Sequence, residues 1–216
     1  MWHKVNKRYV GTKQVRPSWR LPSAYQEVEW IQWTGSQYIN TGFVPNQNSK
    51  VEFMVSNLIW WSSWDHDIFW ADKGWKNSWF NVYYWQYWAQ AWQVSFWSAW
   101  YHWGENCYIA DWNIHTGTLS KDWYYVDWTL CAWPWTYTFT SVNLYLFALD
   151  RNWSAIEYSN TGRIHYIKLY DNWTLVRNFV PCYRKSDSVI WLYDLVNSAF
   201  YNNAWSWTFT KWPDVN

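Results

Sequence analysis

The sequence predicts an all-β protein, an antiparallel β-sandwich of the jelly-roll type. Short runs of alternating apolar residues recur along the chain and are separated by Asn, Asp, Pro and Ser. No segment of ten or more residues carries the continuous apolar stripe of an amphipathic helix. A chain of 216 residues is long enough for one sizeable domain, or for one domain with an arm.

The expected strands follow from this alternation. Val51, Phe53 and Val55 share one face of KVEFMVS, and Phe80, Val82 and Tyr84 share one face of WFNVYYW. NLYLFALD is apolar on both faces, which indicates a central strand. Later strands are expected in RIHYIKLYD, TLVRNFVP and AFYNNA. We divide the chain into a basic arm or linker over 1–20 and one jelly-roll domain over 21–213.

The charge distribution argues against a nucleic-acid groove in the main body. Six of the 17 basic residues precede the first acidic residue, Glu27, which leaves 11 basic against 16 acidic residues in the rest of the chain. Phosphate recognition would need a basic stripe there. No window approaches the length of an apolar membrane span, and 1–20 lacks the apolar core of a signal peptide. We therefore expect neither nucleic-acid binding nor membrane insertion.

The three cysteines are Cys107, Cys131 and Cys182, and none lies in a C-x-x-C pair typical of zinc or redox sites. We interpret them as buried thiols, with room for one disulfide.

Tryptophan is in surplus and glycine is scarce. The chain has 27 Trp and 7 Gly, where average usage predicts about 15 glycines. Asn-Gly and Asp-Gly, the usual hairpin turns, are absent, while tryptophan follows Asx at five places: Trp112, Trp123, Trp128, Trp153 and Trp173. A sugar-binding platform would gather such rings in one place, and here they are scattered over the connections. We hypothesise that most of these tryptophans are native glycines whose UGA codons were read by the wrong genetic code.

Both ends of the chain resemble a known family. LPSAYQEVEWIQWTGSQYINTGFVPNQNSKVEFMV is similar to the opening of laminin-G-like, concanavalin A-like lectin-glucanase domains of bacterial surface and phage tail proteins. IKLYDNWTLVRNFVPCYRKSDSVIWLYDLVNSAFYNNAWSWTFTKWPDV resembles the ending of these domains, and DIFWADKG resembles a middle strand. Family members usually have glycine at the positions of Trp70, Trp173, Trp191, Trp205, Trp207 and Trp212. Trp30 occupies an aromatic position, and Ile167 replaces a cysteine that could have paired with Cys182.

The resemblance raises the question of glycoside hydrolysis, which needs two carboxylates close together, commonly from an E-x-D-x-E strand. None of the five glutamates begins such a motif. Glu27 and Glu29 share one strand face, opposite Val28 and Trp30, and we expect this pair to face solvent. Sequence signatures for a nucleophile or a phosphate loop are also missing.

Two clusters remain as candidate sites. Tyr83, Tyr84, Tyr87 and Tyr101 are the candidate ligand-binding residues, because a tyrosine ring with its hydroxyl suits a sugar. Asp65 and Asp67 are weak candidates for Ca²⁺, because two oxygen donors are too few for this ion. We expect no other metal, no cofactor and no catalytic residue.

The sequence thus indicates a non-catalytic recognition module of a larger protein, located outside the cell, at a cell surface or on a virion. Its expected partner is a glycan or surface polysaccharide. The alternative is a structural or protein-binding spacer domain without glycan affinity, and a glycoside hydrolase ranks last.

Overall fold

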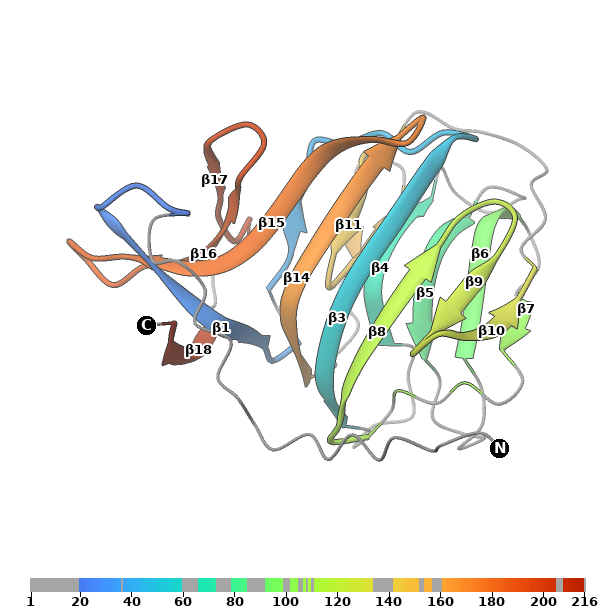
Figure 1. Cartoon of the computed structure of the whole chain (residues 1–216), viewed down its shortest axis with the longest axis horizontal. Coiled ribbons are helices and arrows are strands. Elements are labelled where there is room, and N and C mark those ends of the chain that lie inside the picture. The colour runs from blue at the N-terminus through green and yellow to red at the C-terminus, as the bar shows by residue number, and fades with distance from the viewer. Residues whose placement is uncertain are drawn as a thin grey trace, which may run out of the picture.

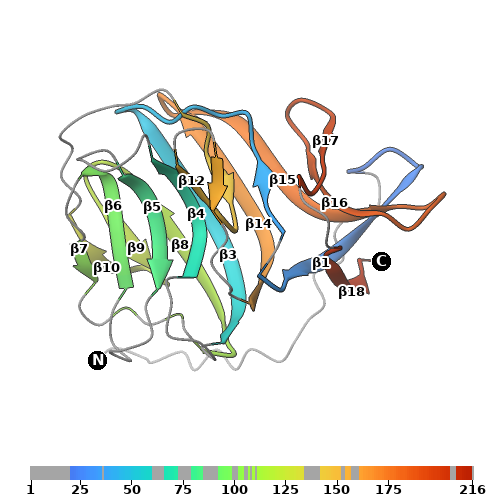
Figure 2. The ribbon, with the colours of Figure 1, turned by 180° about the vertical axis from the view of Figure 1, so that it is seen from behind.

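The computed structural model describes residues 20–35, 37–59, 66–72, 79–84, 92–98, 102–104, 107, 109, 111–133, 142–151, 154–156, 161–204 and 208–215. The arm over 1–19 lies outside these residues. Two sheets face each other, a ten-stranded sheet in front in Figure 1 and an eight-stranded sheet in front in Figure 2. The described part of the chain contains no helix, so the all-β antiparallel β-sandwich is confirmed. No helix long and apolar enough to cross a membrane occurs among the described residues.

The large sheet is antiparallel throughout its described pairings. Its strands run in the order β10 (Thr129–Ala132), β9 (Tyr124–Val126), β8 (Ile114–Leu119), β3 (Ser49–Ile59), β14 (Thr161–Asp171), β1 (Tyr25–Trp33), β15 (Thr174–Arg184), β16 (Ile190–Asp194) and β17 (Ala199–Tyr201), with β18 (Thr210–Asp214) on β1.

The small sheet covers only part of the large one. Its main path is β13 (Ser154–Ile156), β12 (Leu149–Arg151), β4 (His66–Asp72), β5 (Trp79–Tyr84), β6 (Trp92–Ser98) and β7 (His102–Gly104), and β11 (Tyr145–Leu146) joins β4 to β2 (Ile39–Asn40). The β15–β16–β17 end of the large sheet extends past it in both ribbon views (Figures 1 and 2).

The core fills the space between the sheets, as the alternation predicts. Val51, Phe53 and Val55 are all fully buried on β3, and Phe80 and Val82 are fully buried on β5. Burial of large apolar side chains of this kind stabilises the fold by about 1.5–3 kcal/mol each. Strand alternation therefore fixes which face of each central strand lies inward.

Gly117 makes one close approach in this core. It lies opposite Phe53 on the neighbouring strand, and a Cβ there would lie 2.1 Å from Phe53 Cζ. Any larger residue would displace the ring, so the Phe53 position depends on glycine at 117.

A second apolar cluster lies at the extended end of the large sheet. Leu21, Val180, Cys182 and Tyr193 are buried there, with Phe200 packed against them. Successive residues Phe179 and Val180 belong to different clusters, so β15 is covered on both faces.

The expected central strand NLYLFALD is wrong as a single element. It is divided into β11 and β12 by Phe147, which has φ of 68°. The ring of Phe147 is buried, stacked on Trp33 with centroids 4.3 Å apart and edge-on to Phe209. Packing of this ring offsets the cost of the left-handed backbone and turns the chain between the two strands.

Candidate binding surface

The predicted tyrosine cluster falls mostly outside the described residues. The backbone of Tyr83 pairs with Asp67 and Gln93, and that of Tyr84 pairs with His66 and Trp92. The side chains of both tyrosines, and the whole of Tyr87 and Tyr101, are not described. A role for these four residues stays a prediction.

Of the predicted acidic pair Asp65 and Asp67, only Asp67 belongs to the described residues, on β4. Asp67 is fully buried, and it pairs with Tyr83, which alternates with the core residues Phe80 and Val82 of β5. Asp65 lies outside the described residues. Within the described ranges, no group of three or more His, Cys, Asp or Glu side chains is arranged to hold a metal ion.

The expectation that Glu27 and Glu29 both face solvent is wrong for Glu27. Only 9% of Glu27 is exposed, and Arg20 donates to both of its carboxylate oxygens, with Nε 3.0 Å from Oε2. Glu29 remains exposed. Both residues border a hollow, which is completed by Val28, Met54, Ile114, His165 and Val215. Arg20 neutralises the carboxylate of Glu27. The hollow is therefore bordered by one ion-paired carboxylate and by the exposed side chain of Glu29.

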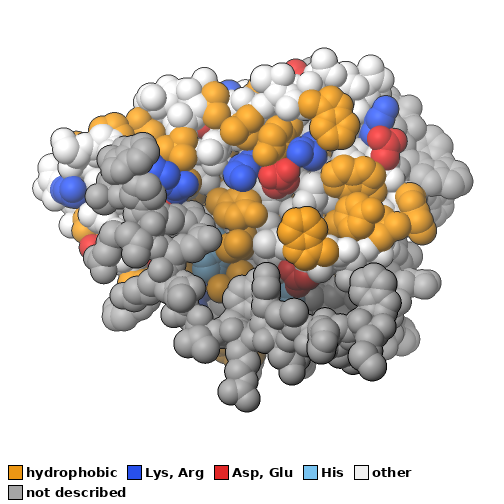
Figure 3. Space-filling model, viewed as in Figure 1, with side chains coloured by type: hydrophobic (Ala, Val, Ile, Leu, Met, Phe, Trp, Pro, Cys, Tyr) orange, Lys and Arg blue, Asp and Glu red, His pale blue; other side chains and the backbone are white. Residues whose placement is uncertain are grey.

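The outer face of the large sheet gathers polar and aromatic side chains on its three central strands. The pairing of β3 with β14 sets Lys50 opposite Tyr170, Glu52 opposite Lys168, and Met54 opposite Tyr166. The pairing of β3 with β8 adds Thr118 beside Glu52 and Thr116 beside Met54. We call these eight residues the outer-face platform; all are half-buried. Figure 3 shows hydrophobic and charged side chains interspersed over the described part of this face.

Glu52 organises the centre of the platform. Lys50 Nζ donates to Glu52 Oε1 over 2.7 Å, and the Tyr170 hydroxyl donates to Glu52 Oε2 over 3.0 Å. Lys168 Nζ lies 3.8 Å from the same Oε2 atom. The two ammonium groups also lie near aromatic rings, Lys50 Nζ 3.9 Å from the centroid of Tyr170 and Lys168 Nζ 5.1 Å from that of Tyr166. These contacts hold long side chains in fixed positions on rigid strands.

The platform has defined protonation states at neutral pH. Burial raises the pKa of Glu52, but hydrogen bonds from Lys50 and Tyr170 outweigh it and hold that pKa below its usual value. Burial, and then the hydrogen bond to Glu52, raise the pKa of Tyr170 to about 12. The platform therefore presents an ionised carboxylate at Glu52 and a neutral phenol at Tyr170.

Strand alternation carries a signal for this platform, although the sequence alone did not lead to it. The residues between Val51, Phe53 and Val55 are Glu52 and Met54, so the same alternation that identified the core also identified one row of the outer face. What the alternation could not show is that β14, more than one hundred residues later, lies directly beside β3.

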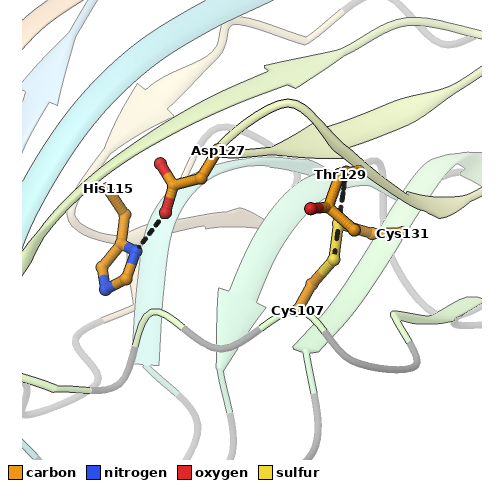
Figure 4. Close-up of a disulfide and its surroundings, with 5 residues drawn as sticks. All are labelled: Cys107, His115, Asp127, Thr129 and Cys131. Carbon is orange, nitrogen blue, oxygen red and sulfur yellow. Dashed lines mark hydrogen bonds and ion pairs between the residues drawn. A yellow bond between two sulfur atoms is a disulfide. The ribbon is translucent and has the colours of Figure 1, made fainter. Parts of the chain in front are cut away.

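The edge of the sandwich carries a covalent link, shown in Figure 4. Cys107, just beyond β7 of the small sheet, forms a disulfide with Cys131 of β10 in the large sheet. The sequence left room for one disulfide, and the structure forms it between Cys107 and Cys131, while Cys182 is a buried free thiol. The link ties the two sheets together where both have an edge strand.

Comparison of the chain with protein-family models, curated protein sequences and solved structures finds no match.

Proposed function

We propose that the chain is a non-catalytic recognition module that binds carbohydrate through the outer-face platform. The observation that carries the proposal is the arrangement of Tyr166 and Tyr170 beside Lys168 and Glu52 on β3 and β14. A pyranose ring has apolar C–H faces and a rim of hydroxyls, so it needs aromatic surface next to charged or polar hydrogen-bonding groups. The platform supplies both, and none of its residues is a tryptophan.

The resemblance of both chain ends to laminin-G-like, concanavalin A-like jelly rolls of surface and phage tail proteins supports the same function by analogy. Location outside the cell fits the Cys107–Cys131 disulfide, because disulfides persist mainly in oxidising compartments. We propose that the module displays the platform as part of a larger surface or tail protein.

Titration of the protein with a broad glycan panel tests this function. We expect binding to at least one glycan, and a loss of tenfold or more in affinity for Tyr166→Ala and for Lys168→Ala, which corresponds to about 1.4 kcal/mol. Trp112→Ala is the aromatic control, because Trp112 is exposed and lies off the platform. Circular dichroism of each variant checks that it is folded.

Two outcomes would contradict the proposal in different ways. Absence of binding across the panel would favour a spacer or protein-binding domain. Glycan binding that survives both platform substitutions would keep the recognition function and move its site elsewhere, with the tyrosine cluster of Tyr83, Tyr84, Tyr87 and Tyr101 next to be tested.

A further inference from the structure

Two hairpins of the large sheet have the same turn geometry. Val126 pairs with Thr129 around Asp127 and Trp128, and Asp171 pairs with Thr174 around Asn172 and Trp173. In both turns the two central residues have positive φ, 46° and 70° in the first and 46° and 66° in the second. Positive φ at both positions defines the type I′ turn, for which Asn-Gly and Asp-Gly are strongly preferred.

Positive φ suits the first central residue of each turn, Asp127 or Asn172, but does not suit the tryptophan that follows it. Asp and Asn tolerate the left-handed region because their short polar side chains bond locally, whereas a bulky residue there is strained. Trp128 is 95% exposed and Trp173 is 74% exposed, so burial does not offset the strain. Lys50 Nζ lies 5.7 Å from the Trp173 ring centroid, a cation–π contact worth little at an exposed site.

Phe147 shows what a large residue needs in this region of backbone space. Its φ of 68° matches that of the two tryptophans, yet its ring is buried between Trp33 and Phe209. Neither turn tryptophan has a comparable enclosure.

Other tryptophans do not share this geometry. Trp112 and Trp123 also follow aspartate, and Trp70 and Trp191 also occupy glycine positions of the resembled family, but none of the four has positive φ. The sign of φ therefore distinguishes positions 128 and 173, where the backbone favours glycine, from these four positions, where it does not.

We propose that residues 128 and 173 are glycines in the native protein, encoded by UGA codons that the producing cell reads as glycine. Each position then has the ordinary type I′ sequence, Asp-Gly or Asn-Gly, without strain. The inference is independent of the proposed function, since neither residue 128 nor residue 173 belongs to the platform. As a consequence, the rings of Trp128 and Trp173, the two most exposed tryptophans among the described residues, are not ligand-binding groups.

The coding DNA and the mass of the native protein test the inference directly. We expect UGA at codons 128 and 173 and UGG at codon 30, and hairpin peptides from the producing cells lighter by the difference between tryptophan and glycine residues. A UGG codon at 128 or 173, or tryptophan in either peptide, would overturn the assignment.

Melting temperatures test the strain argument on the protein that carries tryptophan at positions 128 and 173. W128G and W173G should each raise the melting temperature by about 2–4 °C, because each removes strain of roughly the size found for bulky residues at positive φ. W112G is the matched control, an exposed tryptophan after aspartate without positive φ, and we expect no increase there. Failure of both turn variants to raise the melting temperature would refute the strain argument.

Discussion

His115 on β8 and Asp127 in the β9–β10 turn are joined by a hydrogen bond of 2.6 Å between Nδ1 and Oδ2 (Figure 4). The other ring nitrogen, Nε2, lies 2.8 Å from Oδ1 of Asp111 in the segment that precedes β8. Asp127 Oδ1 also accepts from the Thr116 backbone N–H over 2.8 Å. The largely buried imidazole of His115 thus connects the β9–β10 turn to Asp111, which lies between Cys107 and β8 in the chain.

Replacing this imidazole should weaken the sheet edge. We expect His115→Ala to lower the free energy of unfolding by about 1–3 kcal/mol, because Asp111 and Asp127 both lose their contacts with the imidazole. His115→Gln, which can keep one donor, should lose less. Urea denaturation measures both, and an unchanged midpoint for the alanine variant would show that the contacts contribute nothing.

The same contacts predict a loss of stability in acid. Burial raises the pKa of Asp111, but hydrogen bonds from His115 and Asn113 outweigh it and leave that pKa below its usual value. A carboxyl group whose pKa is lowered by folding stabilises the native state above its unfolded pKa, and this contribution disappears as pH falls through the folded pKa. Comparison of acid unfolding curves should show a smaller loss in His115→Ala than in the parent. Identical pH dependence in the two proteins would contradict this.

The disulfide should make stability depend on reducing agent. Cys107 and Cys131 are 24 positions apart, and closing a loop of this size is worth about 3 kcal/mol. We expect dithiothreitol to lower the melting temperature by about 6–12 °C. The double variant Cys107→Ser with Cys131→Ser is the control, since its melting temperature should be low and independent of dithiothreitol. A parent protein indifferent to reduction would contradict the link.

Cys182 should be unreactive until the protein unfolds. Burial, and then the charge of Glu27, raise the pKa of its thiol to about 12. At pH 8 about one thiol in ten thousand would be ionised, and the thiolate is the form that reacts. Labelling with iodoacetamide, read by mass spectrometry, should modify Cys182 in urea but not in native buffer. Rapid native labelling would show that the site opens readily.

Two tyrosine hydroxyls should respond differently to removal. Tyr124 is fully buried, and its hydroxyl has no hydrogen-bond partner among the described residues. Tyr124→Phe should therefore leave stability unchanged or raise it, since no bond is lost and a desolvated polar atom is removed. Tyr170→Phe should lower stability by about 0.5–1.5 kcal/mol, because Glu52 loses a donor. Chemical denaturation of both variants checks the contrast, and a large loss for Tyr124→Phe would point to an interaction outside the described residues.

Much of the architecture could be predicted from alternation and turn residues. Val51, Phe53 and Val55 were placed correctly because a strand has a period of two, whatever its neighbours are. The break in the strand at Phe147 could not be predicted in this way. The apolar run NLYLFALD gives no sign that the Phe147 ring stacks on Trp33 of another strand. The buried state of Glu27 also depends on its pairing with Arg20, seven residues earlier, which strand alternation does not identify.

The sequence by itself determined the all-β class, the inward faces of the central strands and the hairpin at Asn172 and Trp173. These depend on interactions between residues near one another in the chain, which periodicity and turn chemistry describe. Only the tertiary structure decided that Cys107 meets Cys131, that Asp67 is buried, and that β14 lies beside β3. Strand order and register depend on packing between segments far apart in sequence, and local patterns do not encode that packing.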